Sequence, residues 1–236
     1  MSYETDMRYL LSEIESLKRR LQFQERLETQ VSAYGWIPAG ETWTYAYSTT
    51  VTISGDKPAK YSKGMKVKLT QTTVKYFYIT AVSYSAPNTT LTLTAGSDYT
   101  VANAAITSPY YSVVANPVGF PQTFNFTPVG SSYGGMTFTV DNIDIAKFNI
   151  NEGIATFWIS INGTATGTES DSMAIVQPFP LVSIYPIGYA QISDGGWGIK
   201  GIMITQTDII RCRKEDLTNY SLGETKWLRA AFFVPI

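Results

Sequence analysis

The apolar residues change their spacing once along this chain, near residue 36, and that change limits the folds open to it. Before it, apolar side chains recur alternately four and three residues apart, the heptad spacing of a helix that packs against other helices. After it, apolar and polar residues alternate with a period of two, which is typical of strands with one buried face. The sequence therefore predicts a mainly β protein with an N-terminal helix.

The heptad pattern of residues 1–33 predicts a coiled coil. A short isolated helix is marginal in water, so its apolar stripe needs a covering surface. Self-association supplies that surface, and the alternative is a single amphipathic helix packed on its own globular domain. The candidate oligomerisation residues occupy the seam of the heptad: Met7, Leu10, Ile14, Leu17 and Leu21.

The charged residues beside the seam favour parallel, in-register helices. In that arrangement Glu13 of one chain faces Lys18 of the next. Arg20 faces Glu25 in the same way, so both pairs join opposite charges. We therefore expect a parallel homo-oligomer, whose number of chains the heptad does not fix.

Residues 34–118 predict a small antiparallel β domain. Short apolar strands are separated by turn signals such as Ser54-Gly55-Asp56 and Ala86-Pro87-Asn88. Closure of these strands into a barrel would hide the edges that so many short strands expose. We therefore expect a β-barrel-like domain.

Residues 119–236 predict a second β domain, which begins in a proline-rich, linker-like stretch at 117–128. Its apolar alternation gives about eight strands, with turns at glycine-containing pairs such as Asn162-Gly163. That number of strands suits a β-sandwich of jelly-roll type. A C-terminal jelly-roll domain is therefore expected.

Residues 36–128 also contain a run of short motifs whose order is more specific than any single motif. They are Trp43-Thr44-Tyr45, residues 66–71, Lys75-Tyr76-Phe77, residues 96–99, residues 106–112 and residues 116–128. The run resembles a module of tailed-bacteriophage virion proteins, where it lies between a short helical segment and a variable distal domain. The resemblance implies a structural protein of the virion, assembled in the host cytoplasm, and favours a trimer, the usual symmetry of fibre proteins of this type.

The composition argues against an enzyme. Histidine is absent and Cys212 is the single cysteine, so the commonest acid–base residue and the commonest metal ligand are missing. The carboxylates Asp141 and Asp144 could suggest a glycosidase, but Asp141-Asn142 lies where a turn is expected, and solvated carboxylates are common in turns. We expect no catalytic residue, no metal and no cofactor.

Charge and hydropathy exclude two further kinds of partner. The formal net charge of -1 offers no general attraction to nucleic acid. No stretch approaches the roughly 20 apolar residues that span a bilayer, so membrane insertion is not expected. A run of lysines between Lys57 and Lys75 is expected to protect strand edges or to contact another virion protein.

Trp197 is the candidate ligand-binding aromatic, because glycines flank it and Asp194 precedes it. An aromatic ring on a loop can stack on a sugar while a nearby carboxylate accepts hydrogen bonds from hydroxyls. Tyr189 is a second candidate platform. The alternative is that Trp197 lies in the core or in a subunit interface, since tryptophan is strongly buried on average.

Two functions fit these expectations. One is a tail or baseplate fibre whose C-terminal domain binds a host-surface carbohydrate as receptor. The other is a purely architectural protein, such as a baseplate adaptor or a capsid-attached head fibre. The expected partners are further copies of the chain and other virion proteins, joined in the first case by the carbohydrate.

Overall fold

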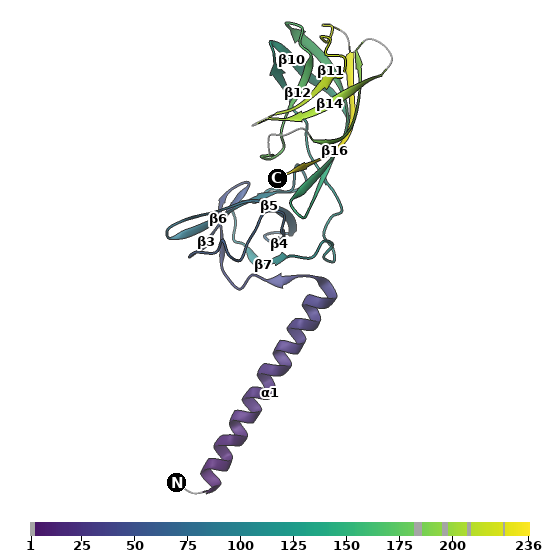
Figure 1. The fold of residues 1–236 in the computed structure, drawn as a ribbon. Helices are drawn as coiled ribbons and strands as arrows, with labels where there is room; N and C mark the ends of the chain where they lie inside the picture. Colours follow the sequence, from purple (N-terminus) through teal and green to yellow (C-terminus); the bar gives the residue numbers. More distant parts are fainter. Residues whose placement is uncertain (1–2, 182–185, 195–197, 207–208, 224) are drawn as a thin grey trace.

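The computed structural model describes residues 3–181, 186–194, 198–206, 209–223 and 225–236. The molecule is elongated: a helix lies at one end, a seven-stranded sheet in the middle and a barrel at the other end (Figure 1). The predicted mainly β class and the predicted N-terminal helix are both confirmed.

Helix α1 (Tyr3–Tyr34) projects from the rest of the molecule (Figure 1). It ends at Gly35, whose φ of 71° lies in the left-handed region that favours glycine after a helix. The next residue, Trp36, is buried, and its Nε1 donates a hydrogen bond to the Val118 carbonyl at 2.8 Å. The Val118 amide in turn donates to the Tyr34 carbonyl at 2.9 Å, so the helix root is fixed to the sheet domain.

The middle sheet is antiparallel throughout, in the strand order β1-β7-β4-β5-β6-β3-β2. Its strands are β1 (Ile37–Pro38), β2 (Trp43–Tyr47), β3 (Thr50–Ser54), β4 (Lys66–Thr70), β5 (Val74–Ser85), β6 (Asn88–Thr94) and β7 (Thr107–Ser112). The predicted turn at Ala86-Pro87-Asn88 joins β5 to β6.

This sheet curls without closing through strand pairing among the described residues, so the barrel predicted for this part is wrong. Its two edge strands, β1 and β2, are consecutive in the chain. The ring of Tyr61 packs edge-on against Trp43 of β2, with centroids 5.7 Å apart, and against Tyr111 of β7 at 5.4 Å. Aromatic side chains therefore connect edge strand β2 to β7, the strand next to the other edge, where a barrel would use backbone hydrogen bonds.

The C-terminal part is a closed barrel of eight strands, in the ring order β10-β11-β16-β13-β14-β15-β12-β9, and not a jelly-roll sandwich. The short strand β8 pairs with β10 and is not one of the eight strands of the ring. The strands are β8 (Phe124–Asn125), β9 (Gly130–Tyr133), β10 (Met136–Asn151), β11 (Ile154–Gly167), β12 (Ser172–Val176), β13 (Ile187–Asp194), β14 (Ile199–Thr205), β15 (Ile209–Lys214) and β16 (Thr225–Pro235).

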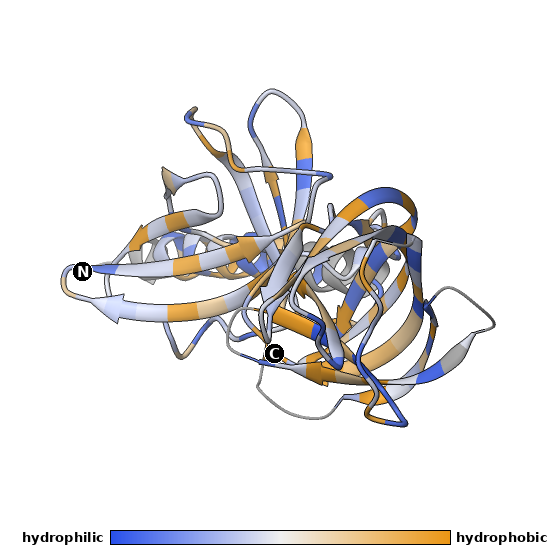
Figure 2. Cartoon of the chain, turned by 90° about the horizontal axis from the view of Figure 1, so that it is seen from above, coloured by the Kyte–Doolittle hydropathy of each residue, from blue (hydrophilic) through white to orange (hydrophobic). Residues whose placement is uncertain are grey.

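The long hairpin of β10 and β11 explains the wrong prediction of a sandwich. Register shifts in β10 between Val140 and Asn142, and again between Ile143 and Ile145, change which side chains face inward. The apolar pattern is therefore interrupted, although the strand continues. Gly163, expected in a turn, lies inside β11 instead, where a Cβ atom would meet the Thr139 carbonyl oxygen at 1.9 Å. Figure 2 shows the alternation of hydrophobic and hydrophilic residues along the barrel strands.

The sheet and the barrel share one aromatic core. Phe120, Phe124 and Phe126 are all buried, so the stretch 117–128 is not a linker but part of the packing between the two units. Tyr78 of β5 packs edge-on against Phe124, with centroids 5.4 Å apart, and Phe124 contacts Phe148 of β10 at 6.0 Å. This packing fixes the barrel to the sheet.

Candidate binding surface

The seam of helix α1 is exposed in the single chain. Every described side chain between residues 7 and 25 is exposed, so this part of the helix does not pack on its own domain. The predicted seam residues are 43% to 57% exposed: Met7, Leu10, Ile14, Leu17 and Leu21. The single chain therefore leaves the predicted seam uncovered.

Asp194 does not lie on the surface as the sequence suggested. Its side chain is 7% exposed and lies at one end of the barrel, where Lys226 Nζ approaches Oδ1 at 2.9 Å. Lys214 Nζ contacts Oδ2, and the Ser221 hydroxyl donates to Oδ1 at 2.7 Å. Burial alone would raise the pKa of Asp194, but these hydrogen bonds outweigh it and lower the pKa to about 2. Asp194 is therefore a structural ion-pair partner, not a ligand acceptor.

The other two predicted ligand residues have different outcomes. Trp197 lies outside the described residues. Tyr189 lies on β13 and is 58% exposed, on the outer wall of the barrel. It lines a groove of about 470 Å³, within the roughly 300–1,000 Å³ typical of ligand sites.

Two rows of side chains from neighbouring strands form this groove. The aromatic row crosses β11, β16 and β13 and consists of Trp158, Ala231 and Tyr189, which are direct partners in the sheet register. The polar row lies beside it, with Ser160 paired to Arg229 and Asp144 at the edge. The groove therefore presents an aromatic surface next to hydrogen-bonding groups.

The polar side chains of the groove are held in place by their neighbours. The Ser160 hydroxyl donates to Asp144 Oδ2 at 3.2 Å, and the Asn142 amide donates to Oδ1 at 2.8 Å. The guanidinium of Arg229 lies 5.1 Å from the ring centre of Trp227, within cation–π range. Asp144 lies on strand β10, as does Asp141, so the turn predicted at Asp141-Asn142 is wrong, although both carboxylates are exposed.

The sequence prediction missed Trp158, Arg229 and Asp144. Residues 155–161 were predicted as an alternating strand, and Ala155, Phe157, Ile159 and Ile161 are indeed buried, whereas the residues between them are partly exposed. Strict alternation along β11 therefore gives the outward direction of Trp158 and Ser160. That alternation was the available signal.

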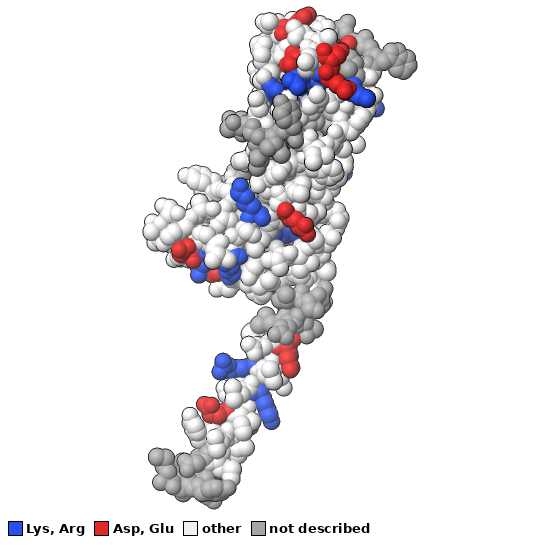
Figure 3. Space-filling model, in the orientation of Figure 1, with Lys and Arg blue, Asp and Glu red and all other residues white. Residues whose placement is uncertain are grey.

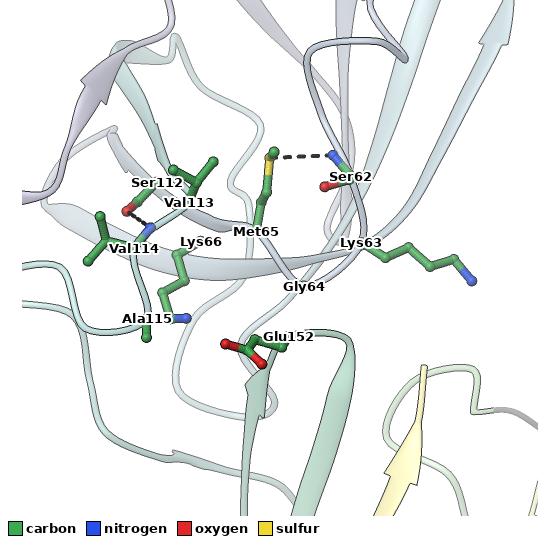
Figure 4. Close-up of a pocket in the computed structure, with 10 residues that line it drawn as sticks. All are labelled: Ser62, Lys63, Gly64, Met65, Lys66, Ser112, Val113, Val114, Ala115 and Glu152. Carbon is green, nitrogen blue, oxygen red and sulfur yellow. Dashed lines mark hydrogen bonds between the residues drawn. The ribbon is translucent and has the colours of Figure 1, made fainter.

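A second pocket of about 200 Å³ lies where the sheet meets the barrel (Figure 4). Lys66 of β4 is buried there and donates to Asn151 Oδ1 at 3.3 Å, and burial lowers the pKa of its ammonium. Glu152, in the turn between β10 and β11, lines the same pocket. Because the volume is below that of ordinary ligand sites and the buried lysine joins the two units, this pocket belongs to the junction.

Most lysines of the run in the sheet domain make contacts within the chain. Lys60 Nζ lies 2.7 Å from a carboxylate oxygen of Glu41, and Lys68 Nζ lies 4.3 Å from the ring centre of Tyr110. Lys75 donates to the Thr100 carbonyl at 2.7 Å. Figure 3 shows a largely uncharged face, with charged side chains on the helix, at one edge of the sheet domain and near the free end of the barrel.

Metal binding, thiol reactivity and membrane crossing were considered for the part of the chain that the structure describes. Within it, no group of three or more histidine, cysteine, aspartate or glutamate residues could hold a metal ion. Burial raises the pKa of Cys212 to about 12, so its thiol stays protonated at neutral pH. The described helix is not long and apolar enough to cross a membrane.

Comparison with family models, with curated proteins and with solved structures gives no match for this chain.

Proposed function

We propose that this chain is a structural and adhesive component of a bacteriophage virion, assembled from parallel copies through helix α1 and carrying the barrel as its receptor-binding end. The observation that carries the proposal is the exposed heptad seam on a helix that stands clear of the body, with the barrel at the opposite end of the molecule (Figure 1). The resemblance of residues 36–128 to phage virion proteins supports the same assignment.

Parallel assembly has a geometric consequence that suits adhesion. In-register helices align the C-terminal ends of α1 in all copies, so that all barrels lie at the same end of the assembly. Because several binding sites on one assembly engage a surface together, weak individual contacts give strong attachment. A trimer, the symmetry we propose, would present three barrels.

A purely architectural role is the second candidate, favoured by an apolar patch at the helix root. Its exposed members are Tyr34, Val113, Val114 and Val118. Tyr34 and Val118 share the hydrogen bond at the point where the helix leaves the sheet, and Val114 lies beside Gly35 at the same point. A baseplate adaptor or a capsid-attached head fibre would cover this patch with a neighbouring virion protein.

The proposal is tested by imaging purified virions labelled with an antibody against the barrel. Label at the end of the tail or on the baseplate is the result expected for an adhesive fibre. Label on the capsid surface would favour the architectural role. Absence of the chain from purified virions, measured by mass spectrometry, would contradict both.

A further inference from the structure

We infer that the groove between Trp158 and Tyr189 on the outer wall of the barrel is a carbohydrate-binding site. The inference rests on the proposed function and gives its adhesive part a location and a ligand class. It replaces the loop at Asp194 and Trp197 as the candidate site, because the Asp194 carboxylate is enclosed by two lysines.

The aromatic row has a spacing between its strands that can accommodate a sugar ring. Trp158 and Tyr189 flank Ala231 with one strand between them, so their backbones lie about 9.5 Å apart, twice the usual strand spacing. A ring held between two aromatic faces needs about 7 to 8 Å, twice the optimal contact distance between carbon atoms. Ala231 contributes only a methyl group to the floor, which leaves that space open.

The polar row has the chemistry that sugar hydroxyls require. Asp144 accepts hydrogen bonds and Arg229 donates them, and the Ser160 hydroxyl lies between them in the register. Because Asn142 and Ser160 already orient the carboxylate, and Trp227 supports the guanidinium, binding a ligand costs little side-chain ordering.

The combination favours a glycan over a second copy of the chain. A pyranose ring has an apolar face of C–H groups and an edge of hydroxyls, which matches an aromatic row beside a polar row. A contact between copies would have to bury the Asp144 carboxylate and the Arg229 guanidinium, and burying charges is unfavourable unless partners match them. The apolar side chains Ile187 and Phe233, on the next row of the same wall, extend the surface along which a longer glycan would lie.

The test uses the full chain on an array printed with oligosaccharides of hexoses, N-acetylhexosamines and uronic acids, followed by calorimetry with the strongest binder. We expect Tyr189→Ala to weaken the affinity per site about tenfold or more, since it removes one stacking ring. Ala231→Phe should abolish binding because its ring fills the floor. Tyr47→Ala is the matched control, since Tyr47 is 73% exposed on β2, and it should bind as the wild type does.

Each other outcome overturns the inference. If the wild type binds but neither groove variant is weakened, the site lies elsewhere. If the wild type binds no printed oligosaccharide, the ligand class is wrong, whereas the virion imaging decides the proposed function independently. If Tyr189→Ala or Ala231→Phe lowers the mass measured by light scattering, the groove is a contact between copies. Thermal melting of each variant verifies folding, and the exposed Tyr189 remains a usable probe should Ala231→Phe not fold.

Discussion

The ammonium nitrogen of Lys226 lies 2.9 Å from Oδ1 of Asp194, and the two side chains are only 0% and 7% exposed. Lys214 shares the same carboxylate, so one buried acid serves two buried bases. A charge removed from water is tolerated only while an opposite charge and hydrogen bonds compensate for it. The stability of this end of the barrel therefore depends most on the acid.

Asp194→Asn should be strongly destabilising, because it removes the carboxylate that two buried ammonium groups share. We expect a loss of about 3–5 kcal/mol in the free energy of unfolding, the usual cost of breaking a buried ion pair. Lys226→Met should cost less, since Asp194 keeps Lys214. Urea titrations measure both, with the exposed Asp141→Asn as control. Equal midpoints for Asp194→Asn and this control would contradict the analysis.

The same carboxylate makes stability depend on pH at the acidic end. The pKa of Asp194 is about 2 in the folded chain, below its ordinary value of 3.8, so the folded state binds its proton less readily than the unfolded state. Its stabilising contribution is therefore complete above about pH 4 and is lost as the pH falls from about 4 to about 2. Urea midpoints measured across this range should fall more steeply for the wild type than for Asp194→Asn. Parallel curves would show that other groups cause the acid sensitivity.

Ile14→Asp combined with Leu17→Asp should dissociate the assembly, because a buried seam does not accept carboxylates. The mass from light scattering should fall from a multiple of 26.1 kDa to the single-chain value. Ser12→Asp combined with Ser16→Asp introduces the same charges on the opposite face of the helix and should leave the mass unchanged. A wild-type chain that is monomeric at micromolar concentration would contradict the proposed assembly.

Gly163→Ala tests whether the long hairpin needs a residue without a side chain. A methyl group there would meet the Thr139 carbonyl oxygen at 1.9 Å and the Phe138 ring at 2.8 Å, so the backbone would have to move. We expect a loss of about 1–3 kcal/mol, typical of overpacking in a core. Asn162→Ala, on the partly exposed face of the same strand, should lie within about 0.5 kcal/mol of the wild type. Similar melting temperatures for the two variants would refute this role of Gly163.

Local signals in the sequence predicted the elements well, and distant contacts explain the errors. Heptad spacing locates the helix, and the change of apolar spacing near residue 36 locates its end, since both signals act within a few residues. Closure of the barrel depends on the pairing of β11 with β16, far apart in the chain, which no local pattern specifies. The bulges in β10 further concealed the strand that makes the longest hairpin.

The candidate site shows the same limit. The sequence placed Asp194 in a flexible-looking context, because glycines follow it, yet its partners Lys214 and Lys226 come from later strands and remove it from the surface. Tyr189 was proposed only as a second aromatic platform beside Trp197. Trp158 was missed because alternation along residues 155–161 identifies a strand and its two faces, but does not show which neighbouring strands lie beside it. Only strand register brings Trp158 and Tyr189 to either side of Ala231.

The aromatic core between Tyr78, Phe124 and Phe148 has a mechanical meaning. With a flexible hinge at this junction, a force applied to the barrel would rotate the barrel and would not be transmitted to the helix. Packed rings, with Trp36 anchored to Val118 at the other end of the sheet domain, transmit that force instead. Sideways force on the barrel would therefore arrive at the helix root as torque, and the molecule would act as a stiff lever.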